Sequence, residues 1–383
     1  MYIYLIMFGL SCFFIYIGEK NNNKKIGKFF YFFALILPCI LAGMRANTIG
    51  TDVKIYGLPI YKCAEFSNGF TNFLGMFVRS AKYVKDYEIG FILIEYLGCK
   101  IFNSFQIVLF LIQLLIIIPI YYGIKCNEDL KGKKCWAFLV FYFMFYNTGL
   151  NLMRQYIGLA FLFLGTNLLL YSTKKNNIKF FICLIIACLF HTSSILGIFI
   201  FIICKLLNSK KDKKLIISNT IKLSTKKIKL FLVILFGFSL LFGVDYLVRI
   251  LNSFGFSYYS QYIDGELTSA KSLIIRNLPM IILVVLLYKN VTKKFKNTYF
   301  YVVCFVLNLI ILQFSSINLH AARIALFFSI FNIEFYGMLV NCVESKDTKL
   351  LIKISVVLYL IFYWYYSFVF LGGSETVPYK FYG

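Results

Sequence analysis

The sequence predicts an all-α polytopic membrane protein, formed by a single integral membrane domain over residues 1–383. Apolar residues make up 60% of the chain, and the mean hydropathy is +0.79. The apolar residues gather into long runs that are separated by short, lysine-rich gaps. No polar stretch is long enough to bury a core of its own. These observations exclude a soluble globular protein.

The apolar runs give the predicted helices in chain order. A helix needs about 20 apolar residues to cross the hydrocarbon layer, with a range of about 17–25. The first run lacks a basic amino-terminal region and a cleavage site, so it is interpreted as a retained span rather than a signal peptide. The predicted spans, about twelve in number, are residues 2–18, 28–44, 104–122, 135–149, 154–171, 178–191, 193–207, 228–247, 272–288, 298–315, 321–342 and 351–371. This even number places both termini on one side.

The basic residues orient these spans. Of the 40 basic residues, 27 lie in the gaps at 19–28, 123–134, 172–179, 205–229, 289–297 and 343–353. Lysine-rich gaps of this kind face the cytoplasm. The alternate gaps then face outward, and all six arginines lie in these gaps or within the first five residues of the span that follows: Arg45, Arg79, Arg154, Arg249, Arg276 and Arg323. Chance, combined with snorkelling at helix ends, is the alternative explanation of this segregation.

Two segments could be assigned differently. The run from Tyr87 to Phe102 is apolar, but it contains Glu88, Glu95 and Lys100. As a span it would invert every later lysine-rich gap, so we predict an outward amphipathic or re-entrant helix.

The segment from Phe180 to Leu207 is long enough for one tilted helix. One helix would place its two lysine-rich flanks on opposite sides. We therefore predict a break at 191–194.

Two outward loops are large. Residues 45–103 form the first and include the amphipathic helix, and residues 248–271 form the second. Together with the outward turns at 147–154, 191–194 and 315–323, these loops should enclose any functional site. The tail 372–383 also faces outward.

Several function classes lack their signals. The net charge of +24 comes from lysines in the gaps between spans, not from a nucleic-acid-binding face. The eleven cysteines show no C-x-x-C pair and read as small core residues. No phosphate-binding loop and no zinc-binding helix motif is present. The sequence therefore predicts neither a metal nor another cofactor.

The outward arginines point to an anion at the membrane surface. A guanidinium binds phosphate bidentately and stays charged when buried. Arg154 and Arg323 each follow a polar turn at the start of a descending helix, where the helix dipole adds positive potential. We favour these two, with Arg45 as a third and Arg276 as a secondary candidate. A pyrophosphate would suit several arginines, although an interfacial anchor explains any single one equally well.

Other outward side chains suit proton transfer. His191 lies at the predicted helix break and could accept a proton or hold a phosphate oxygen. Asp52 and Glu88 flank the first loop and are candidate general bases. Gln155 and His320 are secondary candidates. The alternatives are a helix-end histidine and solvated loop carboxylates.

Five short motifs carry a resemblance to a known family. They are Gly43-Met44-Arg45 with Ile49-Gly50-Thr51-Asp52 and Tyr56; Tyr87-Glu88-Ile89-Gly90-Phe91; Met153-Arg154-Gln155-Tyr156-Ile157; Phe190-His191-Thr192-Ser193-Ser194; and Arg323 at the start of a late helix. Their order over about 45–325 resembles the Wzy/EpsG family of bacterial polysaccharide polymerases. The family often has proline where Ile89 stands.

The resemblance implies a metal-independent glycosyltransferase of GT-C-like architecture. Such an enzyme joins polyprenyl-diphosphate-linked (undecaprenyl diphosphate) repeat units of O-antigen, capsule or exopolysaccharide on the outer face of the bacterial cytoplasmic membrane. The implied partners are the lipid-linked oligosaccharide, the lipid bilayer, a flippase and a chain-length regulator, with no nucleic acid. A flippase of the same lipids, a membrane acyltransferase and a ligase of finished chains remain open as alternatives.

Overall fold

A computed structural model describes residues 1–79, 82–171, 176–207, 214–218, 221–224, 270–316 and 319–383. The chain divides into two compact units. Unit 1 comprises Met1–Gly197 and Ser345–Gly383, and unit 2 comprises Ile198–Glu344. Each unit is described by itself. The predicted span 228–247, Arg249 and most of the loop 248–271 lie outside the described residues.

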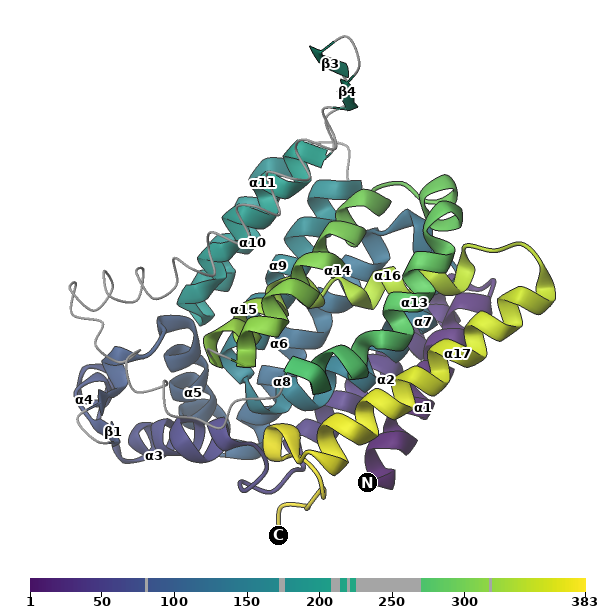
Figure 1. The fold of residues 1–383 in the computed structure, drawn as a ribbon. Coiled ribbons are helices and arrows are strands. Elements are labelled where there is room, and N and C mark those ends of the chain that lie inside the picture. The colour runs from purple at the N-terminus through teal and green to yellow at the C-terminus, as the bar shows by residue number, and fades with distance from the viewer. Residues whose placement is uncertain (80–81, 172–175, 208–213, 219–220, 225–269, 317–318) are drawn as a thin grey trace. The chain divides into compact units, whose positions relative to one another are not determined.

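Unit 1 is helical apart from one short hairpin (Figure 1). Its α-helices are α1 (Tyr2–Lys20), α2 (Lys24–Gly43), α3 (Leu58–Phe66), α4 (Phe70–Leu74), α5 (Ile89–Phe102), α6 (Phe105–Cys126), α7 (Lys134–Phe141), α8 (Asn147–Asn151), α9 (Met153–Tyr171), α10 (Asn176–Phe190) and α17 (Lys346–Trp364). Strands β1 (Phe77–Arg79) and β2 (Lys82–Tyr83) pair antiparallel. π-Helical turns cover Val53–Gly57, Tyr142–Tyr146 and Tyr365–Phe370, and a 3-10 turn covers Thr192–Leu196.

Unit 2 contains α11 (Gly197–Leu207), which begins at the unit boundary, α13 (Ala270–Lys294), α14 (Thr298–Gln313), α15 (Leu319–Ser329) and α16 (Asn332–Asn341). Strands β3 (Lys214–Ser218) and β4 (Ile221–Ser224) form a second antiparallel hairpin. Helices α15 and α16 meet at a bend of 44°.

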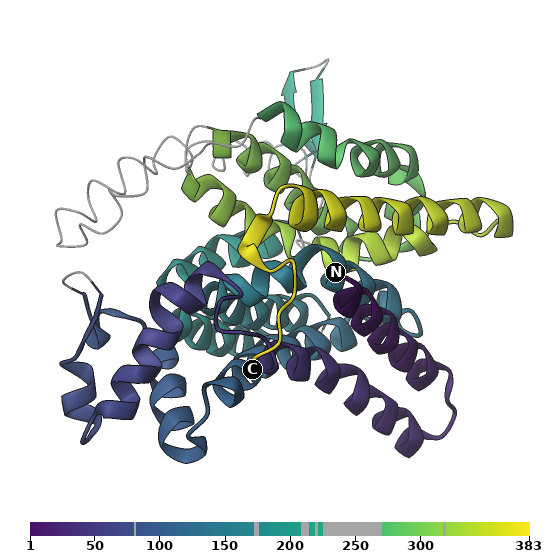
Figure 2. The same cartoon turned by 90° about the horizontal axis from the view of Figure 1, so that it is seen from below.

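Different contacts lie at the two ends of α1 in unit 1. At one end, Glu19 of α1 accepts hydrogen bonds from the backbone and side chain of Lys134, and so caps the start of α7. At the other end, Arg45 pairs with Phe381 in an isolated antiparallel bridge. The Tyr4 hydroxyl donates there to the Thr376 carbonyl at 2.8 Å. Both termini therefore lie at the end of unit 1 that holds Arg45 (Figure 1, Figure 2).

Six helices of the described chain are long and apolar enough to cross a membrane, or seven if the bent pair Ala321–Ser329 and Asn332–Asn341 is one span. Three further apolar helices are shorter: Asn176–Phe190, Thr192–Leu207 and Thr298–Gln313. The predicted span 135–149 is helical over its whole length, with a π-helical turn at Tyr142–Tyr146 between α7 and α8. The all-α multi-pass character is confirmed, whereas the count of about twelve spans is not.

Both ambiguous segments have a defined structure. The predicted amphipathic helix is α5, whose 14 residues are too few for a span. It packs against α3, α6 and α10. The predicted break in the long apolar segment is confirmed, because α10 ends at Phe190 and His191 is extended with φ −155° and ψ 112°.

Candidate functional site

Three helix ends of unit 1 meet at the candidate site: the starts of α5 and α9 and the end of α10. Two glycines permit the close approach. A β-carbon on Gly90 of α5 would lie 2.8 Å from the carbonyl oxygen of Leu189 in α10. A β-carbon on Gly158 of α9 would collide with the Ser194 hydroxyl and would lie 3.5 Å from the His191 β-carbon. Larger residues at these positions would separate the three helix ends.

Glu88, which directly precedes α5, contacts residues at the start of α9 and just after the end of α10. Its Oε2 accepts a charge-assisted hydrogen bond from Nη1 of Arg154, the second residue of α9. Its Oε1 lies 3.4 Å from His191 Nδ1 and also accepts the Thr192 backbone N–H at 3.4 Å. The His191 contact meets the distance of an ion pair but not the geometry of a hydrogen bond. One carboxylate thus contacts residues that are 66 and 103 positions away in the sequence.

The surroundings keep Glu88 ionised. Burial raises the pKa of Glu88, but His191 and the positive charge of Arg154 lower it by more, and the resulting pKa is about 2. Glu88 is therefore a carboxylate at neutral pH and a weak base. Its side chain is 15% exposed, as is that of His191, and Arg154 is 21% exposed. The three side chains are therefore partly accessible to solvent.

Arg154 lies against aromatic rings. Its Cζ is 4.2 Å from the centroid of Tyr56, 5.2 Å from that of Tyr87 and 6.0 Å from that of Phe91. Stacking of this kind fixes a planar guanidinium and leaves its edge for an anion. Tyr87 and Glu88 immediately precede α5 and Phe91 lies in its first turn, so one short segment supplies both the carboxylate and part of the stacking surface.

Asp52 reaches the same cluster through Tyr56. The Tyr56 hydroxyl donates to Oδ2 of Asp52, four residues earlier. The Asp52 backbone N–H donates to Oδ1 of Asn151 at 2.9 Å, which ties this turn to the end of α8, two residues before α9. Burial is the main cause that raises the pKa of Tyr56, so its phenol stays protonated. We refer to Asp52, Tyr56, Tyr87, Glu88, Arg154 and His191 as the Glu88 cluster.

Other predicted site residues of unit 1 are not at the surface of this cluster. Arg45 is 1% exposed, and its Nη2 donates to the Met153 sulfur at 3.4 Å. Burial lowers the pKa of Arg45 to about 10, with Tyr146, Tyr4 and Tyr379 opposing this shift, so it remains a cation at neutral pH. Gln155 is 4% exposed.

Three predicted site residues belong to unit 2. His320 and Arg323 lie in the first turns of α15, and Arg276 lies in the first half of α13. Arg276 and Arg323 are half-buried and each has interaction partners.

Two buried acids were not predicted as site residues. In the sequence, the charge of Glu95 argues only against a membrane span. In the structure, its carboxyl is fully buried and has no hydrogen-bond partner among the described residues. Glu334 lies at the start of α16, where its Oε2 accepts the Tyr301 hydroxyl at 2.8 Å. Only their occurrence within apolar runs could have identified these two acids.

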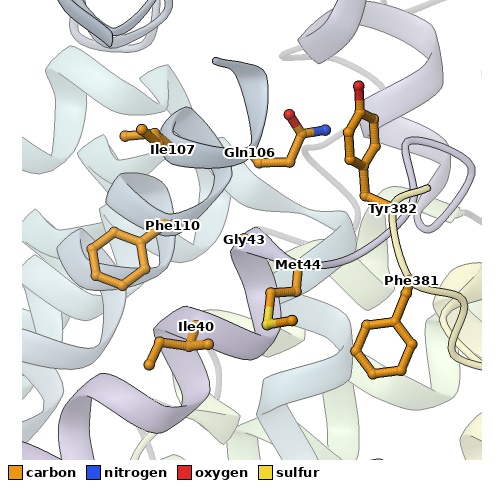
Figure 3. A pocket seen from close by; sticks show the side chains of 8 residues that line it. All are labelled: Ile40, Gly43, Met44, Gln106, Ile107, Phe110, Phe381 and Tyr382. Atoms are coloured by element: carbon orange, nitrogen blue, oxygen red, sulfur yellow. The ribbon is translucent and has the colours of Figure 1, made fainter.

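A shallow pocket of about 340 Å³ lies apart from the Glu88 cluster (Figure 3). It is formed by the end of α2, the start of α6 and the C-terminal tail; its lining residues are Ile40, Gly43, Met44, Gln106, Ile107, Phe110, Phe381 and Tyr382. These are mainly apolar, and none is a predicted site residue. The cluster of charged groups therefore defines the candidate site better than this cavity does.

Sequence comparison gives one match. The model of the EpsG family matches residues 28–381, which contain all predicted site residues. No curated protein and no solved structure matches the chain.

Proposed function

Because the chain belongs to the EpsG family, we propose that it is a polysaccharide polymerase that joins polyprenyl-diphosphate-linked oligosaccharide repeat units. The proposal includes a metal-independent glycosyl transfer on the outer face of the bacterial cytoplasmic membrane. It also includes about twelve spans in a GT-C-like arrangement. A flippase would deliver the lipid-linked units, and a chain-length regulator would act on the product.

The contact of Glu88 with both Arg154 and His191 is the observation that carries this proposal. Glycosyl transfer from a lipid diphosphate needs a cation for the leaving group and a base for the attacking hydroxyl. Arg154 supplies the first and His191 the second. A single carboxylate holds both groups in position.

The Glu88 cluster assigns a separate role to each group. The exposed edge of Arg154 binds the donor pyrophosphate as its bond to the sugar breaks. His191 Nδ1 faces Glu88, so Nε2 is the nitrogen that takes the proton from the acceptor hydroxyl. Glu88 orients both partners and stabilises the imidazolium that forms. Asp52 is the alternative base, because it is half-buried and its partner Tyr56 remains neutral.

The remaining candidates have supporting roles in the proposal. Arg323 is a phosphate ligand at the start of α15, with His320 and Arg276 as secondary contacts in unit 2. Arg45 is buried and contacts Met153 at the start of α9, so its proposed role is to add positive charge near the phosphates rather than to bind them directly, and Gln155 supports the start of α9. Each of these roles is tested by its own substitution.

The polymerase is tested with purified protein and a lipid-linked repeat unit. The wild-type protein should extend the unit into polymer, and Arg154→Lys should abolish extension, because an ammonium cannot replace a stacked, bidentate guanidinium. Arg323→Lys should do the same. Quantifying each variant in membranes by immunoblot separates lost activity from lost protein. Normal polymer from Arg154→Lys would remove Arg154 from the site.

A lipid transporter is the second candidate function. Glu334 is fully buried beside a bend of 44° between two apolar helices. Buried acids at broken helices are typical of transport pathways. Transfer of a fluorescent lipid diphosphate from one leaflet of a proteoliposome membrane to the other, without chain extension, would favour this function over polymerisation.

A further inference from the structure

Lys82 of β2 contributes a second cation beside the Glu88 cluster. Its Nζ lies 4.8 Å from the centroid of Tyr87, the ring that Arg154 Cζ contacts at 5.2 Å. The two positive charges are therefore no more than about 10 Å apart, which is the Debye length at about 0.1 M salt. No sequence motif distinguishes this lysine from the others of the first loop.

The surroundings of Lys82 indicate mutual repulsion of the two cations. Burial and the positive charge of Arg154 lower the pKa of Lys82, while Glu88 and Asp86 oppose this shift. Glu88 is already paired with Arg154. Glu88 and Asp86 both act on Lys82, yet the two cations still repel each other beside one ring, so a ligand that brings a negative charge to each of them would relieve this repulsion.

We propose that Lys82 and Arg154 form a clamp for the two phosphates of a lipid diphosphate, Arg154 holding one phosphate and Lys82 the other. This inference rests on the proposed function and defines its substrate group: the clamp selects a diphosphate over a monophosphate. Arg154 binds through its planar fork, whereas Lys82 acts as a point charge at the rim of the site.

Lys85 provides a matched control. It lies three residues later, and its Nζ is 5.1 Å from the ring of Tyr83. It therefore has the same cation–aromatic contact as Lys82. Lys85 is exposed, whereas Lys82 is half-buried. Lys82→Met and Lys85→Met both remove one charge from the same hairpin region and keep most of the side-chain stem.

The test measures binding of a polyprenyl diphosphate and of the matching monophosphate to purified protein in detergent. The wild-type protein should prefer the diphosphate. Lys82→Met should reduce this preference about tenfold, Lys82→Arg should retain it, and Lys85→Met should leave it unchanged. If Lys82 had a purely structural role, Lys82→Met would weaken the binding of both lipids equally.

The outcomes separate the clamp from the polymerase. An unchanged preference in Lys82→Met, or a wild-type protein that binds neither lipid, would overturn the clamp. A wild-type protein that shows the Lys82-dependent preference but extends no lipid-linked repeat unit would overturn the polymerase and leave the clamp in place.

Discussion

Two acids that are seven residues apart lie in opposite environments. Glu88 immediately precedes α5 in extended backbone, whereas Glu95 lies within the helix. Glu88 contacts Arg154 and His191 at the start of the helix. Glu95 is fully buried and has no hydrogen-bond partner among the described residues. Burial raises the pKa of Glu95 well above its usual value, whereas that of Glu88 is lowered.

This difference shows what decides the charge of a buried acid. Burial alone gives a neutral carboxyl, as at Glu95, which can neither neutralise an arginine nor orient a histidine. Contact with cations gives the permanent charge of Glu88. The two acids can be compared with the same substitution, since glutamine keeps the shape of either side chain and removes its charge.

The largest expected effect is that of Glu88→Gln on polymerisation. The amide cannot compensate the charge of Arg154 or stabilise an imidazolium at His191, so both reactive groups lose their orientation. We expect kcat to fall on the order of 10⁴-fold, similar to the loss of an orienting carboxylate in a catalytic triad. Polymer synthesis from a lipid-linked unit measures this fall. Glu95→Gln is the control and should retain wild-type kcat. Equal loss in both variants would mean that Glu88 has no special role.

The next effect concerns His191, at the same end of α5. His191→Ala removes the proposed base and should lower kcat on the order of 10²–10⁴-fold. His191→Gln can still donate a hydrogen bond to phosphate, but it takes no proton at neutral pH. Substantial activity in the glutamine variant would shift the role of base to Asp52. Wild-type turnover in the alanine variant would reduce His191 to a helix-end residue.

The sequence predicted the residues of the Glu88 cluster but not their contacts. Apolar runs predicted most helices, and the distribution of lysine predicted the break before His191 and the non-spanning character of α5. The meeting of Glu88, Arg154 and His191 depends on the close approach at Gly90 and Gly158. Such contacts between distant segments leave no periodic pattern, so each acid and base appeared in the sequence as an isolated candidate.

The burial of individual arginine side chains could not be predicted from the sequence either. Arg45 and Arg154 both follow apolar runs at the predicted outer surface, yet the side chain of Arg154 is partly exposed within the Glu88 cluster and Arg45 is covered. The bridge between Arg45 and Phe381 places the C-terminal tail beside Arg45. A contact between residues from opposite ends of the chain cannot be inferred from local composition.

A smaller effect is the pH dependence of stability at Glu88. Its pKa in the folded protein is about 2, below the ordinary value of 4.5. Glu88 therefore stabilises the fold above about pH 4.5, and this contribution is lost as the pH falls towards 2. We expect Glu88→Gln to melt below the wild-type protein at pH 7, with the gap narrowing between pH 5 and 3. Thermal unfolding in detergent measures the gap, and a constant gap would contradict the ionised, paired state of Glu88.

The smallest effect, of opposite sign, is expected at Glu95. Its pKa in the folded protein lies above the ordinary value of 4.5, so the unfolded chain loses this proton first as the pH rises. Glu95 therefore disfavours folding increasingly above about pH 4.5. Glu95→Gln removes this ionisation but keeps a buried polar group, so the melting temperature at pH 7 should rise by only a few °C. The gain should disappear near pH 4. A lower melting temperature at pH 7 would mean that Glu95 is ionised and has a partner. The contrast between Glu88 and Glu95 would then be lost.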